Sequence, residues 1–599
     1  MKFKTPIHVI ALVALMAAGV TVLTLAGPGS GTAIISPSAN VAAGATGEWS
    51  IVYTAAETHD DGTVRITIPS GWTAPQDGSN TSPGFVTVST SEPTGSPSLS
   101  IAGQVVTVVV DTLNSGNTIT VVYGNDAAGA SARATAATTV GSYTFLVASD
   151  PSGGSVSPLA SSPALTVIPT TPASLDIVPN DTTGVDAGSF VQMHVRVLDT
   201  FGNRAPVASN RTVNLFATHG QFFDPSNHST PLSSIVIASG TNSKRVDYRG
   251  TLVAGSPHTI NAFTASGSPS LGGSEFVSLE AGALSVSQST IGATSPVVAD
   301  GAAQSTVTVM SRDAFGNPRE NDTVLIDATG SATDVDPGSP TDVNGEALGA
   351  VASTFAEIVT VSATINGQAV TSGNPSVTFT AGPLSTINST VTATTNIPAN
   401  GTSTSVITVT ARDSNNNPIA GQTVVLAVSP PGNGTLTQPG GVTGANGQIT
   451  GAFASTVTGS RTITATIGGT PINDNEIVQF VAGPVTSFQW THDGTSTAGA
   501  FQNVTLVAKD ALGNIATNYT GTVTLSTTTG GVGDGVVQWD AVTPDAHGTL
   551  SNQPEDDAMY TFVSSDAGQA TLRVTNTRAE TYQVRAQDGG VNQLSSNIV

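Results

Sequence analysis

The sequence predicts an all-β protein in which several β-sandwich modules follow one another along the chain. Three observations lead to this prediction. The composition favours strands and turns, apolar and polar residues alternate with a period of two, and a short acidic turn recurs about every hundred residues. A chain of 599 residues is too long for one hydrophobic core, and this length favours roughly four to six domains.

The composition also limits the classes of function. The chain holds 64 glycines and 34 prolines, while only 10% of its residues are charged. The abundant Val and Thr favour strands, and Gly, Pro and Asn favour turns. The net charge of −23 comes from 41 acidic and 18 basic residues, which argues against nucleic acid as a partner. Cysteine is absent, so the sequence offers neither disulfides nor thiolate chemistry.

The N-terminus has the pattern of an export signal. Lys2 and Lys4 precede an apolar run from Ile7 to Ala26, which predicts a secretory signal peptide over residues 1–33, with cleavage near Ala33. The alternative is an uncleaved anchor, because about 20 apolar residues can span a bilayer. Membrane contact is then expected through this segment only. In both cases we expect the remaining chain to be exported, and to lie outside the cell or on its surface.

The recurring turn reads "MSRDAFGNP" at 310–318 and "TARDSNNNP" at 410–418, with looser copies "VLDTFGN" at 197–203 and "VAKDALGN" at 507–514. Consecutive copies of its aspartate are 114, 100 and 97 residues apart, which is the size of a domain. An alternating run precedes each copy, as with Val307 and Val309, and another follows, as with Val324 and Ile326. The motif is therefore expected to join two half-buried strands.

The residue types of the motif fit a turn. An aspartate accepts hydrogen bonds from main-chain N–H groups two or three residues on, and glycine takes positive φ at no steric cost. The third copy replaces this glycine with asparagine, which tolerates the left-handed region best among the other residues. A cation loop or a catalytic carboxylate would not require that exchange, so a structural turn is favoured. The predicted turn residues are Asp199, Gly202, Asn203, Asp313, Gly316, Asn317, Asp413, Asn416, Asn417, Asp510, Gly513 and Asn514.

Two further signals recur. "VNGEALGAVAST" at 343–354 and "ANGQITGAFAST" at 445–456 each place Asn-Gly between strand-like segments, which predicts hairpins. The copies close with "FVSLEAG" at 276–282, "VTFTAGP" at 377–383 and "VQFVAGP" at 478–484. These joints are too short to be flexible tethers, so neighbouring modules are expected to sit end to end.

This combination of strand, acidic turn, Asn-Gly segment and closing strand resembles the bacterial Ig-like (group 1) repeats of the intimin/invasin adhesin family. The resemblance is strongest over 282–483, looser over 172–281 and 484–599, and absent from 34–171. It implies tandem immunoglobulin-like β-sandwiches that act as stiff spacers and hold a binding tip away from a bacterial surface.

The predicted organisation is a signal peptide, one sandwich of another subtype and four repeats. The first sandwich is expected over 34–171. Repeat 1 covers 172–281, repeat 2 covers 282–382, repeat 3 covers 383–483 and repeat 4 covers 484–599. The last alternating segment, "QLSSNIV", resembles an interrupted strand, so repeat 4 is expected to be truncated.

Catalytic and metal motifs were sought and not found. The chain has eight histidines and no cysteine, and we find no His-Glu-x-x-His pair, Gly-x-Ser-x-Gly elbow or phosphate loop. No catalytic residue and no cofactor are therefore expected. Weak calcium candidates are Asp334, Asp336 and Asp342, but Pro337 and Gly338 break the spacing of a calcium loop. An acidic loop is favoured there, and calcium at domain joints stays open.

The expected function is that of a non-catalytic extracellular spacer or adhesin stalk, built as a monomeric rod. Its partner is expected to be a protein or a glycan on a host cell, a neighbouring cell or an envelope. Two alternatives stay open. The chain could be the accessory region of a secreted hydrolase, or it could be an envelope or surface-layer subunit.

Overall fold

The computed structural model describes residues 29–264, 270–529, 536–540, 545–551 and 556–599. The apolar run at 7–26, and with it most of the predicted signal peptide, lies outside the described residues. The chain divides into two compact units, Met1–Ala283 and Leu284–Val599, and each is described by itself.

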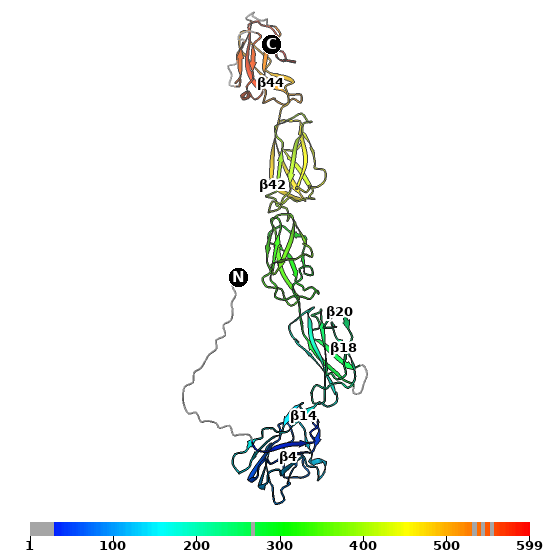
Figure 1. Cartoon of the computed structure of the whole chain (residues 1–599). Helices are drawn as coiled ribbons and strands as arrows, with labels where there is room; N and C mark the ends of the chain where they lie inside the picture. Colours follow the sequence, from blue (N-terminus) through cyan, green and yellow to red (C-terminus); the bar gives the residue numbers. More distant parts are fainter. Residues whose placement is uncertain (1–28, 265–269, 530–535, 541–544, 552–555) are drawn as a thin grey trace, which may run out of the picture. The chain divides into compact units, whose positions relative to one another are not determined.

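Both units are built from strands, which confirms the predicted all-β class (Figure 1). The helical elements of the described residues are two short 3-10 turns, η1 (Ala130–Ala132) and η2 (Ser564–Asp566). Within the same residues, no helix has the length and apolar character needed to cross a bilayer.

The first sandwich lies in the N-terminal unit and packs two main sheets around one core. The first sheet has the order β1 (Thr32–Ser36), β4 (Trp49–Thr54), β9 (Thr118–Tyr123) and β6 (Val86–Thr90). The second has the order β13 (Ser157–Pro158), β12 (Leu146–Asp150), β5 (His59–Thr67), β8 (Val105–Leu113) and β7 (Ser98–Ala102). Two small sheets, β10 (Ala134–Thr135) with β3 (Thr46–Gly47), and β11 (Gly141–Thr144) with β14 (Ala164–Ile168) and β2 (Val41–Ala42), complete it.

The fold of this sandwich begins earlier than the sequence predicted. Strand β1 starts at Thr32 and pairs with β4. The carbonyl oxygen of Ser30 accepts hydrogen bonds from the hydroxyls of Tyr53 and Ser149, both at 2.7 Å. Residues 29–33, which the sequence analysis assigned to the signal peptide, therefore belong to the folded module.

Repeat 1 completes the N-terminal unit. One sheet has the order β15 (Ser174–Pro179), β17 (Phe190–Leu198), β22 (Ser243–Arg249), β19 (Gln221–Asp224) and β20 (Asn227–Leu232). The other has the order β21 (Ser234–Ile237), β18 (Arg211–Ala217), β23 (His258–Thr264) and β24 (Gly272–Val277). A short parallel pair joins β16 (Val185–Asp186) to β25 (Leu279–Glu280).

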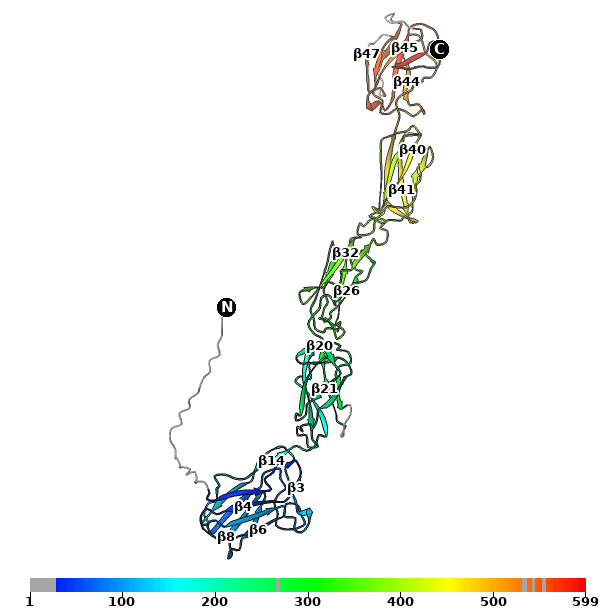
Figure 2. The same ribbon diagram turned by 45° about the vertical axis from the view of Figure 1, so that its right-hand side comes forward.

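Repeats 2 and 3, in the C-terminal unit, share one topology. In repeat 2 the first sheet has the order β26 (Thr290–Ala293), β28 (Ser305–Met310), β31 (Glu346–Ala352) and β30 (Thr333–Val335). The second sheet has the order β27 (Val297–Val298), β34 (Ser376–Thr380), β32 (Ile358–Ile365) and β29 (Val324–Ala328), and β33 (Gln368–Ala369) also pairs with β32. In repeat 3 the first sheet has the order β35 (Thr390–Ala393), β37 (Ser405–Thr410), β40 (Gln448–Ser455) and β39 (Gly434–Thr437). The second sheet has the order β36 (Ile397–Pro398), β42 (Thr470–Val481), β41 (Gly459–Ile467) and β38 (Val424–Ser429). Figure 2 shows β40 and β41, one from each layer of repeat 3.

Repeat 4 is a related sandwich. Its first sheet has the order β43 (Ser487–Thr491), β44 (Gln502–Lys509), β49 (Gln569–Asn576) and β46 (Val537–Asp540). Its second sheet has the order β47 (Thr549–Ser551), β48 (Met559–Thr561), β45 (Thr522–Thr527), β50 (Val584–Asp588) and β51 (Val591–Leu594). Near the end of the chain, Ile598 is fully buried and exchanges two main-chain hydrogen bonds with Tyr582.

Each module has its own apolar core. The alternation seen in the sequence sets its inward side: Val307 and Val309 of β28 are fully buried, whereas Thr306 and Thr308, which alternate with them, face outward. Burying one such side chain stabilises the fold by about 1.5–3 kcal/mol. Strand alternation therefore separates core from surface in every module.

The Asn-Gly segments do not form the predicted two-residue hairpins. A type I′ hairpin needs positive φ at both central residues, whereas in repeat 2 only Gly345 of the Asn-Gly pair has it, with φ of 76°. The carboxylate of Asp342 accepts the main-chain N–H groups of Asn344 and Glu346, both at 2.9 Å. This bonding closes a capped turn at the start of β31, which then pairs with β28 and β30.

Candidate functional site at the domain joints

Each copy of the acidic motif forms the same hydrogen-bonded turn. In repeat 3, Oδ1 of Asp413 accepts the main-chain N–H groups of Asn415 and Asn417, both at 2.8 Å, and its Oδ2 accepts the Asn417 side-chain amide at 2.8 Å. The corresponding three bonds of the other copies measure 2.7–3.0 Å. The carboxylate thus reaches two and four residues on, and not two or three as the sequence analysis expected.

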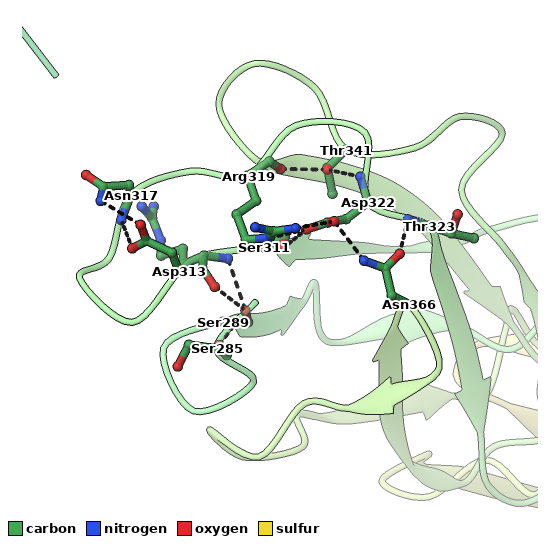
Figure 3. Close-up of polar contacts among 11 residues, drawn as sticks. Ser285, Ser289, Ser311, Asp313, Asn317, Arg319, Asp322, Thr323, Thr341 and Asn366 are labelled. Carbon is green, nitrogen blue, oxygen red and sulfur yellow. Dashed lines mark hydrogen bonds and ion pairs between the residues drawn. The ribbon is translucent and has the colours of Figure 1, made fainter. Parts of the chain in front are cut away.

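The fourth residue of each copy takes the left-handed conformation. Its φ is 82° at Gly202, 84° at Gly316, 67° at Asn416 and 86° at Gly513. The main-chain N–H of this residue donates to the carbonyl of the aspartate at 3.1–3.2 Å, and the chain then reverses direction. Asparagine fits this position because its side chain tolerates positive φ better than other side chains do. Figure 3 shows the repeat 2 copy, with Asp313 beside Asn317.

The final asparagine of the motif also reaches out of its own module. In repeat 3, Nδ2 of Asn417 donates to the carbonyl oxygen of Thr354 in repeat 2 at 2.9 Å. Its Oδ1 accepts the main-chain N–H of Ala356 at 2.8 Å. One side-chain amide therefore imitates a peptide group and makes a two-bond bridge to the loop after β31. We call this pair of bonds the asparagine clamp.

The asparagine clamp recurs at two other joints, each inside one compact unit. Asn514 of repeat 4 donates to the carbonyl oxygen of Thr456 at 3.0 Å and accepts the N–H of Thr458 at 3.3 Å. In the N-terminal unit, Asn203 of repeat 1 donates to the carbonyl oxygen of Thr138 at 2.7 Å and accepts the N–H of Val140 at 3.1 Å. In all three the contacted residues are two apart.

The aspartate holds the connecting segment between modules. Its Oδ2 accepts the main-chain N–H of a linker residue, which is Gly382 for Asp413 at 2.8 Å and Gly483 for Asp510 at 3.2 Å. The equivalent bond from Thr170 to Asp199 measures 3.0 Å. The same carboxylate therefore closes the turn and fixes the linker, so the turn residues and the joint are one structure.

Burial and hydrogen bonding act in opposite directions on these carboxyl groups. Burial of Asp413 favours its neutral form, but hydrogen bonds from Asn417, Gly382 and Asn415 to the carboxylate outweigh this effect and lower the pKa below its ordinary value. The pKa values of Asp199 and Asp510 are lowered by the same balance. A carboxylate that accepts several N–H bonds is stabilised in its charged form, so the joints hold ionised aspartates.

An asparagine is the residue that this geometry needs. Its amide has two N–H donors and an oxygen acceptor. In Asn417 the donors serve Asp413 and Thr354, and the oxygen serves Ala356. An aspartate there would have no donor and would place a second negative charge beside Asp413. The chemistry of the site is therefore structural: the turn that connects the two sheets of one module also forms a joint with the module before it.

A second polar cluster lies next to the turn of repeat 2 (Figure 3). Asp322 is 3% exposed, and its carboxylate receives Nε and Nη2 of Arg319 at 2.9 and 3.1 Å. The Ser311 hydroxyl and the Asn366 amide also donate to it. Although burial by itself raises the pKa of Asp322, these hydrogen bonds and the Arg319 charge lower it overall.

Repeat 3 builds the same backbone without this charge pair. The residues in place of Ser311, Arg319, Asp322 and Asn366 are Ala411, Ile419, Gln422 and Gly468. The threonine of the cluster is retained: Thr443 Oγ1 donates to the carbonyl of Ile419 at 2.7 Å, as Thr341 does to Arg319. The charged side chains of this cluster thus differ between repeats 2 and 3, whereas the backbone and the threonine hydrogen bond are the same in both.

The structure does not bring the weak calcium candidates together into a site. Asp336 Oδ1 accepts the main-chain N–H of Ile326 at 2.7 Å, and Asp342 caps its own turn, whereas Asp334 lies exposed in β30. Over the described ranges, no group of three or more His, Cys, Asp or Glu side chains is placed to hold a metal ion.

The profile of the bacterial Ig-like domain (group 1) family matches residues 288–380 and 388–481. These segments coincide with the sandwiches of repeats 2 and 3. The chain contains two bacterial Ig-like domains of group 1. The resemblance drawn from the sequence is thereby confirmed over these two segments.

One curated relative is the inverse autotransporter adhesin YeeJ of Escherichia coli (strain K12), which is 28% identical over 184 residues. The match covers 29% of this chain and only 8% of that adhesin. Among solved structures, invasin, titled a bacterial integrin-binding protein, is 16% identical with a TM-score of 0.36, covering 69% of this chain and 76% of invasin. The Escherichia coli adhesin FdeC is 18% identical with a TM-score of 0.33, covering 52% of this chain and 100% of FdeC.

Proposed function

We propose that this chain is a non-catalytic extracellular spacer, in which bacterial Ig-like modules are joined through asparagine clamps and hold a partner-binding region away from a cell surface. The observation that supports this most directly is the clamp itself. The same two-bond bridge and the same aspartate–linker bond recur at three joints. A repeated joint of fixed chemistry is what a spacer requires.

The energetics of the clamp fit this role. A single hydrogen bond stabilises a folded state by about 0.5–1.5 kcal/mol net. Two clamp bonds and one linker bond per joint would therefore restrict rotation between modules without making the joint part of either core. Contacts between domains of one chain are usually small and polar, so relative motion is the default. The clamps would reduce that motion.

Two further observations support the assignment. One curated relative is named as an adhesin, and the chain holds neither a His-Glu-x-x-His pair nor a Gly-x-Ser-x-Gly elbow. In this proposal the modules set the distance from the cell surface and resist bending, and they neither attach the chain to the surface nor select its final binding partner. Export through the N-terminal segment and location on the cell surface are part of the same proposal.

Small-angle scattering of the full chain tests the spacer role. The maximum dimension of the wild type should approach the summed length of the modules, and a triple variant, N203A/N417A/N514A, should show a broader distance distribution and a smaller mean size. Asn344→Ala is the matched control, because Asn344 makes a similar bond to an aspartate, Asp342, inside one module. A compact wild-type particle, or a triple variant with an unchanged distribution, would refute the role.

A further inference from the structure

The outward face of one sheet in repeat 1 differs from the corresponding faces of its sister repeats. Three phenylalanines are exposed on β18, β23 and β24: Phe216 is 55% exposed, Phe263 is 45% and Phe276 is 53%. In a chain in which aromatic residues make up only 5%, three exposed rings on one sheet face require an explanation. Large exposed apolar groups that gather together are a feature of interaction sites. We call this surface the phenylalanine face.

The strand register makes two of the three rings, Phe216 and Phe263, neighbours on this face. Phe263 pairs with Asn214, and Phe216 pairs with Asn261, so the two residues are diagonal neighbours, which lie roughly 7–8 Å apart and somewhat closer at Cβ. Phe276 lies on the next strand, β24, opposite Thr259. From the strand spacing and rise, its Cα is about 12 Å from that of Phe216.

Repeats 2 and 3 act as internal references, because their strands align with those of repeat 1 through the buried Val213, Val324 and Val424. The positions of Phe216, Phe263 and Phe276 are then occupied by Asp327, Thr364 and Ser376 in repeat 2, and by Ala427, Thr466 and Ile477 in repeat 3. The fold thus does not require aromatic rings at these three positions. They are a property of repeat 1 alone among the three aligned repeats.

A hollow lies between two of the rings. It has a volume of about 560 Å³ and is lined by Phe216, Asn261, Ala262, Phe263, Gly272, Gly273 and Ser274. The glycines of β24 create it, because Gly272 presents no side chain beside Phe263. Gly273 is fixed by packing, since a Cβ there would lie 2.3 Å from the carbonyl oxygen of Leu175. That contact lies on the inward side of β24, so the hollow on the outward side follows from the missing side chain of Gly272.

The chemistry of this face is neutral and mixed. The outward positions of the four strands hold no charged residue among those described: they are Ser234, Val236, Thr212, Asn214, Phe216, Thr259, Asn261, Phe263, Gly272, Ser274 and Phe276. Amide and hydroxyl groups separate the rings from each other. A protein partner would be expected to bury a continuous apolar centre, and the separation of the rings does not provide one.

We propose that the phenylalanine face of repeat 1 binds a neutral glycan. A pyranose ring has an apolar face of C–H groups, which packs on the negative face of an aromatic ring, and an edge of hydroxyls, which bond to amides such as Asn214 and Asn261. Phe216 and Phe263 are diagonal neighbours, so one glycan chain can contact both rings. The absence of charge on the face, in a chain of net charge −23, matches an uncharged ligand. This binding activity goes beyond the spacer role and does not depend on it.

The test uses the full chain and an array of neutral hexasaccharides of glucose, mannose and N-acetylglucosamine, with sialylated and sulfated glycans beside them. The wild type should bind at least one neutral class, and titration calorimetry should give an affinity that changes little with salt. The variant F216D/F263T/F276S, which carries the residues of repeat 2, should bind at least tenfold more weakly with unchanged thermal transitions.

A control and a second variant complete the experiment. L325N/I358S removes two exposed apolar side chains of repeat 2, which are 51% and 72% exposed, and should bind as the wild type does. Asn261→Ala, which leaves every ring in place, should weaken binding several-fold. The proposal is overturned if no neutral glycan binds, if only anionic glycans bind, or if the triple variant binds normally. Phenylalanine-dependent dimerisation of the chain without glycan binding would also overturn it.

Discussion

Asn417 in repeat 3 and Thr354 in repeat 2 are 63 residues apart in sequence and share a 2.9 Å hydrogen bond, from the Asn417 side chain to the Thr354 carbonyl. The same relationship holds between Asn514 and Thr456 at 3.0 Å. A residue that closes a turn in one module thereby contacts a loop of the module before it. One side chain therefore contributes both to the turn and to the joint.

The first prediction concerns motion at one joint. In a chain without cysteine, spin labels at D327C and A427C report the distance between repeats 2 and 3 through exposed, equivalent positions. Asn417→Ala should broaden this distance distribution, because both clamp bonds are lost. Asn344→Ala should leave it unchanged. Equal distributions in the wild type and the Asn417 variant would show that the clamp does not restrict the joint.

The second prediction concerns the left-handed turn position. Gly316→Ala should destabilise repeat 2 by roughly 1–2 kcal/mol, because the conformation alone opposes a Cβ; no atom lies within 4 Å of the added group. Gly316→Asn should cost less, as the Asn416 copy indicates. Gly345→Ala should cost more than Gly316→Ala, since its Cβ would lie 2.5 Å from the main-chain oxygen of Ser311. Urea denaturation of each variant measures this order.

The third prediction concerns the charge pair of repeat 2. Asp322→Ala leaves the half-buried Arg319 guanidinium without its carboxylate and should destabilise the repeat by roughly 1.5–3 kcal/mol, the range for lost hydrogen bonds to a charged group. The quadruple variant S311A/R319I/D322Q/N366G introduces the residues of repeat 3 and should be close to neutral. Calorimetry of the full chain follows the transition of repeat 2. A quadruple variant as unstable as Asp322→Ala would contradict the view that repeat 2 keeps its backbone with the residues of repeat 3 at these positions.

The fourth prediction concerns acid. The pKa values of Asp413 and Asp510 are lower in the folded chain than in the unfolded one, because hydrogen bonds favour the charged form over the opposing effect of burial. Their stabilisation is fully present above the unfolded pKa of about 3.9 and is lost as the pH falls through the folded pKa. Joint motion, followed with the same spin labels, should therefore increase below about pH 4. Constant distributions down to pH 2.5 would contradict this.

The fifth prediction separates repeat 1 from its neighbours. His258 is fully buried, with Nδ1 2.6 Å from the Tyr248 hydroxyl, and burial, with a smaller effect of His219, lowers its pKa. The unfolded histidine binds a proton below about pH 6.5, so repeat 1 should lose stability as the pH falls from 7.5 to 5.5. Repeats 2 and 3 contain no histidine and should not change in this range. His258→Gln should reduce the dependence, as calorimetry at both pH values would show.

The sequence by itself determined the strand pattern and the turn positions. Alternation of Val307 and Val309 with threonine fixes which side of β28 is buried, because successive side chains of a strand point to opposite faces. The exchange of Gly316 for Asn416 pointed to a left-handed turn because only these residue types adopt positive φ readily. Both signals are local, and neither depends on where the rest of the chain lies.

Only the tertiary structure decided what these elements contact. The clamp of Asn417 on Thr354 and the diagonal pairing of Phe216 with Phe263 join residues far apart in sequence, through loops and strand registers that no period of the sequence encodes. The Asn-Gly segments show the same limit, since the bonds of Asp342 and the pairing of β31 replaced the predicted hairpin. Local propensity sets conformation, whereas contacts between modules depend on how the folded surfaces meet.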